Sequence, residues 1–149
     1  MGETQMTHIT IDGKEIEVDS SLTILEAAQK ADIKIPTLCY LKEVNEIGAC
    51  KMCVVEVEGK NHLVTSCNTK VAEGMQIHTK SDKVVKSRKQ VLNLLLANHD
   101  VRCFSCSKSG DCRLQDLSNE YGITKSCYEG DAAKFAPKKE NPFLTYYPE

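Results

Sequence analysis

The distribution of cysteines constrains this 149-residue chain more than any other feature of its sequence. All cysteines except Cys127 fall into two closely spaced groups. The first group consists of Cys39, Cys50, Cys53 and Cys67, and the second of Cys103, Cys106 and Cys112 with His99 just before them. Each group offers four ligands that suit an iron-sulfur cluster or a closed zinc site. The sequence therefore predicts two metal centres, while Cys127 receives no role.

Composition and charge argue against several other classes of protein. With 41% hydrophobic residues, the chain can build one ordinary core, and a smaller module would need a metal to hold it together. A net charge of -2 and a lack of Trp provide neither a basic surface nor stacking platforms for nucleic acid. The N-terminus has no export signal, and the longest apolar run, residues 91–97, is too short to span a bilayer. We expect a cytoplasmic chain with no nucleic-acid partner and no direct membrane insertion. In that reducing compartment, Cys-x2-Cys pairs bind metal more often than they form disulfides.

Turn residues and alternating apolar positions predict a β-rich first part of the chain. Asp12-Gly13 separates two alternating segments and favours a two-residue hairpin turn. Thr23 and Glu26 have the spacing of a capping box at the start of a helix. The expected elements are strands at residues 7–11, 15–18, 54–58, 62–66 and 75–79, a helix from about 23 to 32, and a ligand-bearing loop over residues 37–49.

Helical periodicity replaces alternation after Lys80. Ser81 is a candidate N-cap for a helix that ends directly before His99. A short amphipathic helix is expected after Cys112, closed by Gly122. The basic residues along the first of these helices, Lys80, Lys83, Lys86, Arg88 and Lys89, are expected to form a solvated face. The expected domains are residues 1–80, residues 81–126 and an extended tail over residues 127–149, which contains Pro137, Pro142 and Pro148.

The first cysteine group favours a [2Fe-2S] cluster. Such a cluster needs two thiolates on each of its irons, and Cys50-x2-Cys53 with Cys39 upstream and Cys67 downstream provides them. Gly48 beside this pair lets backbone N–H groups approach the sulfur atoms. The alternative is a structural zinc site, which usually has two Cys-x2-Cys pairs, whereas this group has one. The residues therefore favour iron-sulfur over zinc.

Segments around the first group carry a resemblance to a known family. They are residues 35–39 (IPTLC), residues 48–59 (GACKMCVVEVEG), and Cys67 with Gly74-Met75 downstream. Through them, residues 1 to about 125 resemble the N-terminal iron-sulfur region of the large subunit of NADH-quinone oxidoreductase (complex I), and of related NADH-linked [FeFe]-hydrogenases and formate dehydrogenases. The resemblance implies an α+β protein with a β-grasp ferredoxin domain, in which Cys39, Cys50, Cys53 and Cys67 hold a [2Fe-2S] cluster.

The spacing of the second group leaves zinc and iron-sulfur open, because one His with three Cys is also a common structural zinc set. In the same family, a small module with one His and three Cys ligands binds a [4Fe-4S] cluster directly after the ferredoxin domain. Residues 98–100 (NHD) and 110–115 (GDCRLQ) are similar to that module. The resemblance therefore implies a small, mostly helical [4Fe-4S] module whose ligands are His99, Cys103, Cys106 and Cys112. The other histidines, His8, His62 and His78, lie in predicted strands and are not expected to bind metal.

The sequence contains no motif for binding a dinucleotide or a nucleoside triphosphate, and no recognisable catalytic constellation. We therefore expect no catalytic site in this chain itself. The resemblance implies single-electron transfer between a flavin-containing NADH-oxidising subunit and a downstream iron-sulfur or catalytic subunit. The complex would be a soluble hydrogenase or formate dehydrogenase, with electron bifurcation as a variant. The alternatives are a zinc-stapled structural adaptor and a redox sensor whose cluster controls partner binding.

Members of the family generally continue into a further ferredoxin-like domain with two more clusters. Residues 141–143 (NPF) resemble the lead-in to that domain, yet this sequence stops at Glu149. We expect a natural small subunit, with a truncated chain as the alternative.

Overall fold

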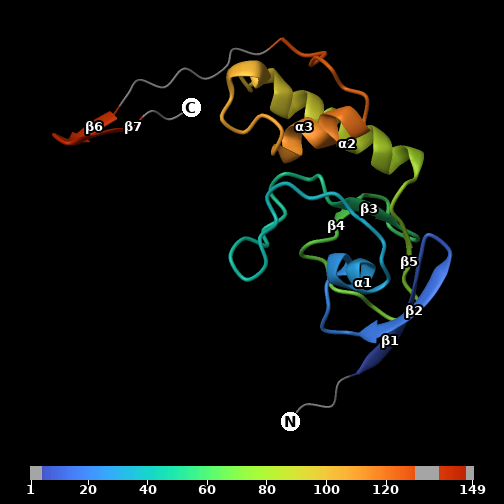
Figure 1. Ribbon diagram of the computed structural model, residues 1–149. Coiled ribbons are helices and arrows are strands. Elements are labelled where there is room, and N and C mark those ends of the chain that lie inside the picture. Colours follow the sequence, from blue (N-terminus) through green and yellow to red (C-terminus); the bar gives the residue numbers. More distant parts are fainter. Residues whose placement is uncertain (1–4, 130–137, 147–149) are drawn as a thin grey trace.

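A five-stranded mixed sheet forms the centre of the first domain in the computed structural model, which describes residues 5–129 and 138–146 (Figure 1). The strand order is β2-β1-β5-β3-β4. The strands are β1 (Met6–Ile11), β2 (Lys14–Asp19), β3 (Val54–Val57), β4 (Val64–Thr65) and β5 (Gln76–His78). β1 runs parallel to β5, and the other neighbouring pairs are antiparallel. Together with the helices described below, this sheet agrees with the expected α+β class.

The first hairpin forms where the sequence predicts it. Asp12 and Gly13 connect β1 to β2 with φ values of 49° and 83°, the pair of left-handed conformations that a type I′ turn requires. The Asp12 carboxylate also accepts hydrogen bonds from the Thr79 backbone N–H, at 2.7 Å, and from the Thr79 hydroxyl. The turn therefore anchors the end of β5 as well as reversing the chain.

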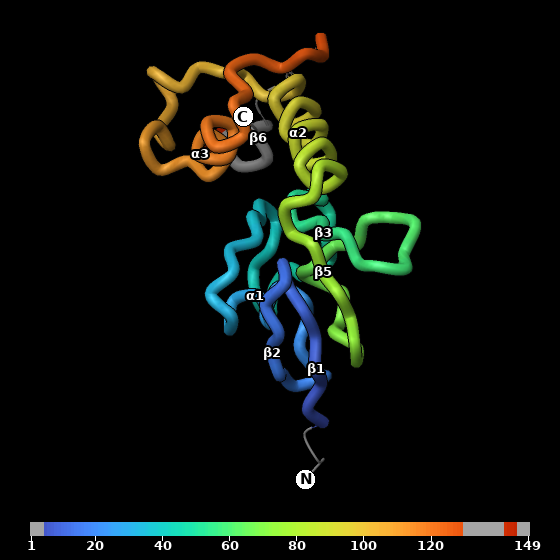
Figure 2. Tube along the Cα trace, turned by 90° about the vertical axis from the view of Figure 1, so that its right-hand side faces the viewer, coloured from blue at the N-terminus to red at the C-terminus, as the bar shows by residue number. Residues whose placement is uncertain are grey.

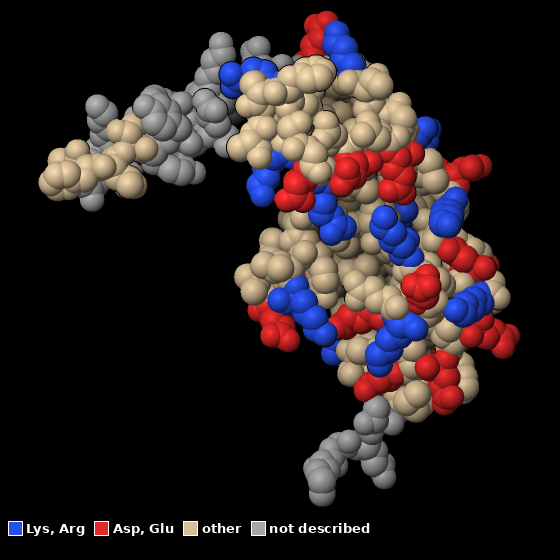
Figure 3. Space-filling model, in the orientation of Figure 1, with Lys and Arg blue, Asp and Glu red and all other residues tan. Residues whose placement is uncertain are grey.

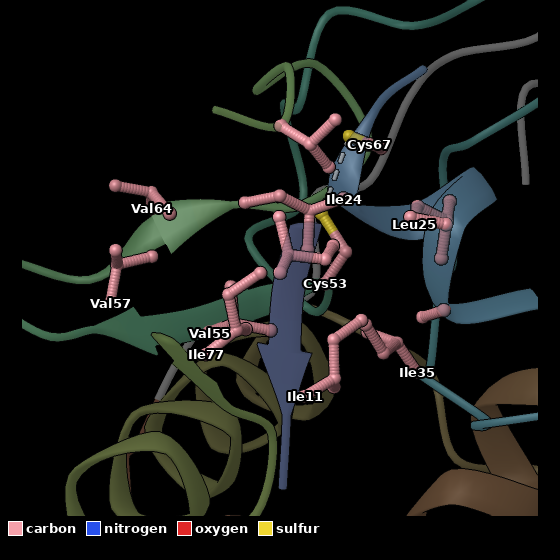
Figure 4. Packing of buried hydrophobic residues seen from close by; sticks show 14 of the residues in the cluster. Ile11, Ile24, Leu25, Ile35, Cys53, Val55, Val57, Val64, Cys67 and Ile77 are labelled. Atoms are coloured by element: carbon pink, nitrogen blue, oxygen red, sulfur yellow. Dashed lines mark hydrogen bonds between the residues drawn. The ribbon is translucent and has the colours of Figure 1, made fainter. Parts of the chain in front are cut away.

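The first helix, α1 (Ile24–Lys30), packs on the sheet and closes the main core (Figures 1 and 4). The predicted capping box is present: the Thr23 hydroxyl accepts from the Glu26 backbone N–H, and the Glu26 carboxylate accepts from the Thr23 backbone N–H. The chain leaves the helix through Asp32, whose φ is 59°. The main core consists of Ile9, Ile11, Val18, Ile24, Leu25, Ala27, Ala28, Ile35, Cys53, Val55, Val57, Val64, Cys67, Val71 and Ile77.

Two strands differ from their prediction. The returning strand expected at residues 62–66 is limited to β4, because the Thr69 N–H bonds back to the Thr65 carbonyl and turns the chain away. β5, expected over residues 75–79 as an edge or a central strand, is limited to Gln76–His78 and lies in the centre between β1 and β3. Parallel pairing with β1 is a long-range contact, which local alternation does not encode.

Three helical segments follow the sheet: α2 (Asp82–Ala97), the 3-10 helix η1 (Cys103–Ser105) and α3 (Arg113–Glu120). Ser81 caps α2 as predicted, since its hydroxyl accepts from the Val84 backbone N–H. α3 ends as predicted at Gly122, whose φ is 67°, and the Ile123 N–H reaches back to the Ser118 carbonyl at 2.8 Å. Figures 1 and 2 place α2 and α3 together beyond the β3 end of the sheet domain.

A second, smaller core joins the helices to the cysteine-bearing loop. Met52, Leu92 and Leu117 are its buried members. Leu38, Cys50, Val91, Leu114, Tyr121 and Ile123 pack against them. Met52 and Cys50 come from the loop before β3, whereas the other large side chains come mostly from α2 and α3. The helices therefore bury their apolar faces partly against the first cysteine group.

The tail differs from its prediction. Within the expected extended tail, β6 (Lys138–Asn141) and β7 (Leu144–Tyr146) form an antiparallel hairpin. Pro142 and Phe143 connect the two strands, and Pro favours such a turn because its ring fixes φ near the value required at the second turn position. Pro142, expected to keep the tail extended, lies instead in the turn between the two strands.

Charged side chains of both signs are interspersed over the face shown in Figure 3. Several of them form ion pairs, such as Lys83 Nζ with Glu56 Oε1 at 2.8 Å and Lys42 Nζ with Glu26 Oε1 at 3.2 Å. In the part of the chain that the structure describes, the helices lack the length and apolar character needed to span a membrane.

Candidate metal centres

The four cysteines of the first group converge from two segments that flank β3 and β4. Cys39 and Cys50 are half-buried on the loop between α1 and β3. Cys53 directly precedes β3 and is 1% exposed, and Cys67 follows β4 and is fully buried. Antiparallel pairing of the two strands brings Cys53 and Cys67 together, although 13 residues separate them in the sequence.

The buried pair Cys53 and Cys67 forms a direct contact between thiols (Figure 4). The two Sγ atoms lie 3.3 Å apart, with the Cys53 thiol donating to Cys67. This distance is far too long for a disulfide bond, and all eight cysteines, which all lie in the described residues, are free. Burial, the hydrogen bond shared with Cys53, in which the Cys67 thiol keeps its proton, and repulsion from negative charge on Cys53, Cys39 and Cys50 raise the pKa of Cys67 to about 12. Cys39, Cys50 and Cys53 all act electrostatically on Cys67, which indicates that the four sulfur atoms lie close together.

Backbone amides point at the sulfur atoms on the exposed side of this group. The Cys50 N–H donates to Cys39 Sγ at 3.4 Å, and the Met52 N–H donates to Cys50 Sγ at 3.5 Å. Burial alone would raise the pKa of Cys50, but the amides of Met52 and of neighbouring residues outweigh it and hold this pKa below its usual value. Lys51, between Cys50 and Met52, has a φ of 57°. The loop is therefore shaped to stabilise negative charge on sulfur.

Gly48 allows the loop to approach the segment that carries Cys67. Its φ is 65°, and a Cβ there would lie 3.0 Å from Asn68 Nδ2 and 3.1 Å from Thr65 Oγ1. Both the backbone conformation and the space thus require glycine. The sequence predicts Gly48 as a site of backbone access to sulfur, and the structure adds a different reason for glycine, the close contact with Asn68 and Thr65.

Ser66 adds a polar group that sequence reasoning missed. Its residue is fully buried, its backbone N–H donates to the Cys53 carbonyl at 3.1 Å, and its hydroxyl has no hydrogen-bond partner among the described residues. This hydroxyl belongs to the residue before Cys67, and its donor is uncommitted among the described residues. Four thiols, amide donors and this hydroxyl form a set that fits a [2Fe-2S] cluster.

The second group lies on the segment that connects α2 to α3. His99 is exposed just after α2, Cys103 begins η1, Cys106 is exposed at the end of η1, and Cys112 precedes the first residue of α3. The Cys106 N–H donates to the Cys103 carbonyl at 3.3 Å, and Cys106 Sγ accepts from the Lys108 N–H at 3.5 Å. One imidazole and three thiols on a single connecting segment are chemically suited to an iron-sulfur cluster.

The structure does not test the predicted ligands one by one. Across the described residues, no three His, Cys, Asp or Glu side chains are placed so that they could hold one metal ion. This holds for the second group as well, although all of its members lie on one short segment. Residue assignments at both centres therefore stay predictions.

Arg88 lies in the interior, contrary to its prediction from the sequence. It was expected on the solvated basic face of α2, yet it is 3% exposed. Its spacing could have revealed this, because Val84, Arg88 and Leu92 lie four residues apart and Val84 and Leu92 are both fully buried. Lys83, from the same basic stretch, is exposed and pairs with Glu56.

Comparison with protein families identifies both parts of the chain. Residues 4–82 match the model of the 2Fe-2S iron-sulfur cluster binding domain. Residues 88–126 match the model of the NADH-ubiquinone oxidoreductase-G iron-sulfur binding region. The predicted cofactors, one [2Fe-2S] and one [4Fe-4S] cluster, are thereby confirmed.

Relatives and a solved structure agree with this result. The chain is 47% identical over 130 residues to NADP-reducing hydrogenase subunit HndD of Solidesulfovibrio fructosivorans, covering 84% of this chain and 22% of that protein. It is 38% identical over 128 residues to the mitochondrial NADH-ubiquinone oxidoreductase 78 kDa subunit of Candida albicans, covering 86% of this chain and 18% of the relative. A chain in the crystal structure of NAD+-reducing [NiFe]-hydrogenase in the H2-reduced state superposes with a TM-score of 0.81 at 33% identity, covering 91% of this chain and 57% of that one.

The chain thus spans about a fifth of the length of these curated relatives. The resemblance to the large iron-sulfur subunits of NADH-quinone oxidoreductases and hydrogenases, predicted from the sequence, is confirmed. This chain belongs to the 2Fe-2S iron-sulfur cluster binding domain family, in the form that is followed by the NADH-ubiquinone oxidoreductase-G iron-sulfur binding region.

Proposed function

We propose that this chain carries single electrons between a flavin-containing, NADH- or NADPH-oxidising subunit and a further redox subunit of a hydrogenase or formate dehydrogenase type complex. It would have no catalytic site of its own. The observation that carries the proposal is the convergence of four thiols around Cys53 and Cys67, within the region that matches the [2Fe-2S] domain family. The similarity to a subunit of an NADP-reducing hydrogenase supports a hydrogenase type complex, and the similarity to an NADH-ubiquinone oxidoreductase subunit supports a link to NADH oxidation.

At the first centre, we propose Cys39, Cys50, Cys53 and Cys67 as the ligands of the [2Fe-2S] cluster, within the β-grasp domain of residues 1–80. When bound, such a cluster supplies the exchange of one electron at a time. The amides of Cys50 and Met52 donate to ligand sulfur atoms and favour the more negative, reduced state. Burial of Cys53 and Cys67 excludes water from the inner side of the site.

At the second centre, we propose His99, Cys103, Cys106 and Cys112 as the ligands of the [4Fe-4S] cluster, within the module of residues 81–126. The match of residues 88–126 to an iron-sulfur binding region supports this set. A neutral imidazole in place of one thiolate leaves this site less negative than one with four thiolates, which favours its reduction. Packing of α2 and α3 on Met52 and Cys50 joins the two helices that flank this segment to the loop of the first centre.

The proposed partners are a flavoprotein on the donor side and an iron-sulfur or catalytic subunit on the acceptor side. Electron bifurcation in such a complex, and a cytoplasmic location, stay predictions. Purification of the native complex without oxygen, followed by identification of the co-purifying polypeptides, tests the partners directly. Absence of any flavoprotein from the purified complex would contradict the proposed donor.

Metal analysis of the full chain, purified without oxygen, tests the function itself. A brown protein with roughly six irons and roughly six acid-labile sulfides per chain is expected from one [2Fe-2S] and one [4Fe-4S] centre. A colourless protein with zinc alone would support the structural adaptor instead. A reduction-dependent change in affinity for the flavoprotein, without electron exchange, would support the redox sensor.

Serine variants test the division of ligands. Cys53→Ser should remove the [2Fe-2S] signal in electron paramagnetic resonance and keep the [4Fe-4S] signal, and Cys106→Ser should do the reverse. Cys127→Ser is the matched control, because Cys127 is exposed and belongs to neither group, and it should keep both signals. Loss of both signals in a folded Cys53→Ser or Cys106→Ser protein would contradict the proposed division.

A further inference from the structure

A buried positive charge lies between the first centre and the helices. Arg88, in the middle of α2, is 3% exposed, whereas Lys86 and Lys89 of the same helix are exposed. A guanidinium group does not lose its proton under any condition in which this protein would work. A full positive charge is therefore held out of water at this point in the fold.

The partners of this guanidinium are neutral. Arg88 Nη2 donates to the Val54 carbonyl at 2.8 Å, and Nη1 donates to the Tyr121 hydroxyl at 3.1 Å. Among the described residues, Nε has no hydrogen-bond partner, and the ion pairs found there do not include Arg88. An unpaired buried charge is among the most unfavourable arrangements in a protein interior. Its presence indicates a compensating negative charge nearby.

The position of Arg88 indicates where that negative charge lies. Val54, whose carbonyl it binds, is the residue after Cys53. Tyr121, its other partner, packs in the small core that also contains Cys50 and Met52. The guanidinium is thus fixed at the first residue of β3, which directly follows the proposed ligand Cys53, and it binds Tyr121 of the small core on which Cys50 packs.

We propose that Arg88 is the counter-charge of the [2Fe-2S] cluster and raises its reduction potential. The inference rests on the ligand set proposed above. A cluster with four thiolates is negative when oxidised and gains one further negative charge when it accepts an electron from its donor. Because Arg88 keeps its proton throughout, its fixed charge stabilises the reduced state more than the oxidised state.

Redox titration of the full chain, loaded with both clusters and followed by electron paramagnetic resonance, tests the proposal. In Arg88→Met, the ratio of reduced to oxidised [2Fe-2S] cluster at a fixed potential should fall about tenfold, equivalent to about 59 mV for one electron. Arg88→Lys keeps the charge without the planar fork and should restore most of the potential. Lys86→Met removes an exposed charge from the same helix and should change the ratio by less than about twofold, because solvent screens that charge.

A second charge-free variant covers the case in which Arg88→Met does not take up its clusters. Arg88→Gln removes the charge but keeps a side-chain N–H donor at this position. Loading in Arg88→Lys, with failure to load in both Arg88→Met and Arg88→Gln, would also support the counter-charge.

Other outcomes overturn the inference. A clamp role that depends on the two hydrogen bonds alone predicts equal defects in Arg88→Lys and Arg88→Met, and that result would overturn the counter-charge. An unchanged potential in a loaded Arg88→Met or Arg88→Gln protein would overturn it as well. If the wild-type chain itself lacked a [2Fe-2S] signal, the proposed function would be wrong, whereas a normal wild-type signal without a shift in the variants contradicts only the role of Arg88.

Discussion

At the scale of single residues, the first centre depends on groups that are not ligands. Gly48 provides space between the ligand loop and the segment before Cys67, and Ser66 provides a buried hydroxyl without a partner among the described residues. Neither residue belongs to the Cys and His pattern from which the metal centres are predicted. We expect the first to matter for the shape of the site and the second for its electrostatics.

Ser66→Ala should lower the reduction potential of the [2Fe-2S] cluster by tens of millivolts, because it removes a hydrogen-bond donor that favours the more negative reduced state. Folding stability should change little, since the hydroxyl makes no hydrogen bond within the described part of the chain. Potentiometric titration measures the first effect and urea unfolding the second. Ser118→Ala is the control, because the Ser118 hydroxyl is committed to the Leu114 carbonyl at 2.7 Å in α3, and it should leave this potential unchanged. A potential in Ser66→Ala equal to that of the wild type would show that the hydroxyl does not face the cluster.

Gly48→Ala should reduce [2Fe-2S] occupancy strongly, because the added Cβ meets Asn68 and Thr65 at 3.0–3.1 Å and the backbone is left-handed. We expect a loss of about 2–4 kcal/mol in stability from the combined clash and strain. Gly59→Ala separates the two causes, since Gly59 also has a positive φ, of 79°, but has no atom near its Cβ position. Iron content and visible absorbance measure the outcome, and equal effects in the two variants would contradict the role given to the clash.

At the scale of elements, local signals define the helices well. The capping box of α1, the Ser81 cap of α2 and the Gly122 end of α3 all form as predicted. Each of them depends on residues within one turn of the helix end, so their sequence contains the necessary information. Strand ends depend on partners elsewhere in the chain, and β4 is accordingly shorter than predicted.

Glu26→Gln should destabilise the protein by about 0.5–1 kcal/mol at pH 7 and by less in acid. The hydrogen bond from the Thr23 backbone N–H is the main cause that holds the pKa of Glu26 below its ordinary value. Lys42 acts in the same direction, and burial opposes both. A depressed pKa contributes stability that is present above the unfolded-state pKa, near pH 4, and is lost as the pH falls through the folded-state value. The difference between wild type and variant should therefore shrink as the pH falls below about 5.

Urea unfolding of both proteins across this pH range, compared pairwise at each pH, checks that trend. Glu15→Gln, on an exposed position of β2, serves as the control with little difference at any pH. A gap between wild type and Glu26→Gln that stayed constant down to about pH 3, below the ordinary carboxyl pKa, would mean that the charge of Glu26 is irrelevant to α1.

At the scale of the whole molecule, the two iron-sulfur regions share packing. Cys50 and Met52 of the first region contact the small core formed by Leu92 of α2 and Leu117 of α3. Arg88 adds hydrogen bonds from α2 to β3 and to Tyr121. A disturbance in this junction should therefore reach both centres, although the proposed ligands of each lie on separate segments.

Leu92→Ala should cost about 2–5 kcal/mol, because Leu92 is fully buried and its removal leaves a cavity in the small core. We expect both iron-sulfur signals to weaken or broaden, since the cavity lies between the two regions. Leu94→Ala, on the same helix at a side chain that is 56% exposed, is the matched control and should leave both signals intact. If Leu92→Ala altered one signal and not the other, the junction would not couple the two centres.

The sequence alone determined the β-rich and helical parts and the helix caps, and its two cysteine groups led to the proposed ligand sets. These features depend on residue chemistry and on neighbours within a few positions, such as Thr23 with Glu26 and Asp12 with Gly13. The tertiary structure decided the central place of β5, the hairpin of β6 and β7, and the burial of Arg88 and Ser66. The physical reason is that strand pairing and burial depend on groups that are distant in the chain. Whether a charged side chain such as Arg88 lies at the surface or in the interior depends on which of those groups pack against it.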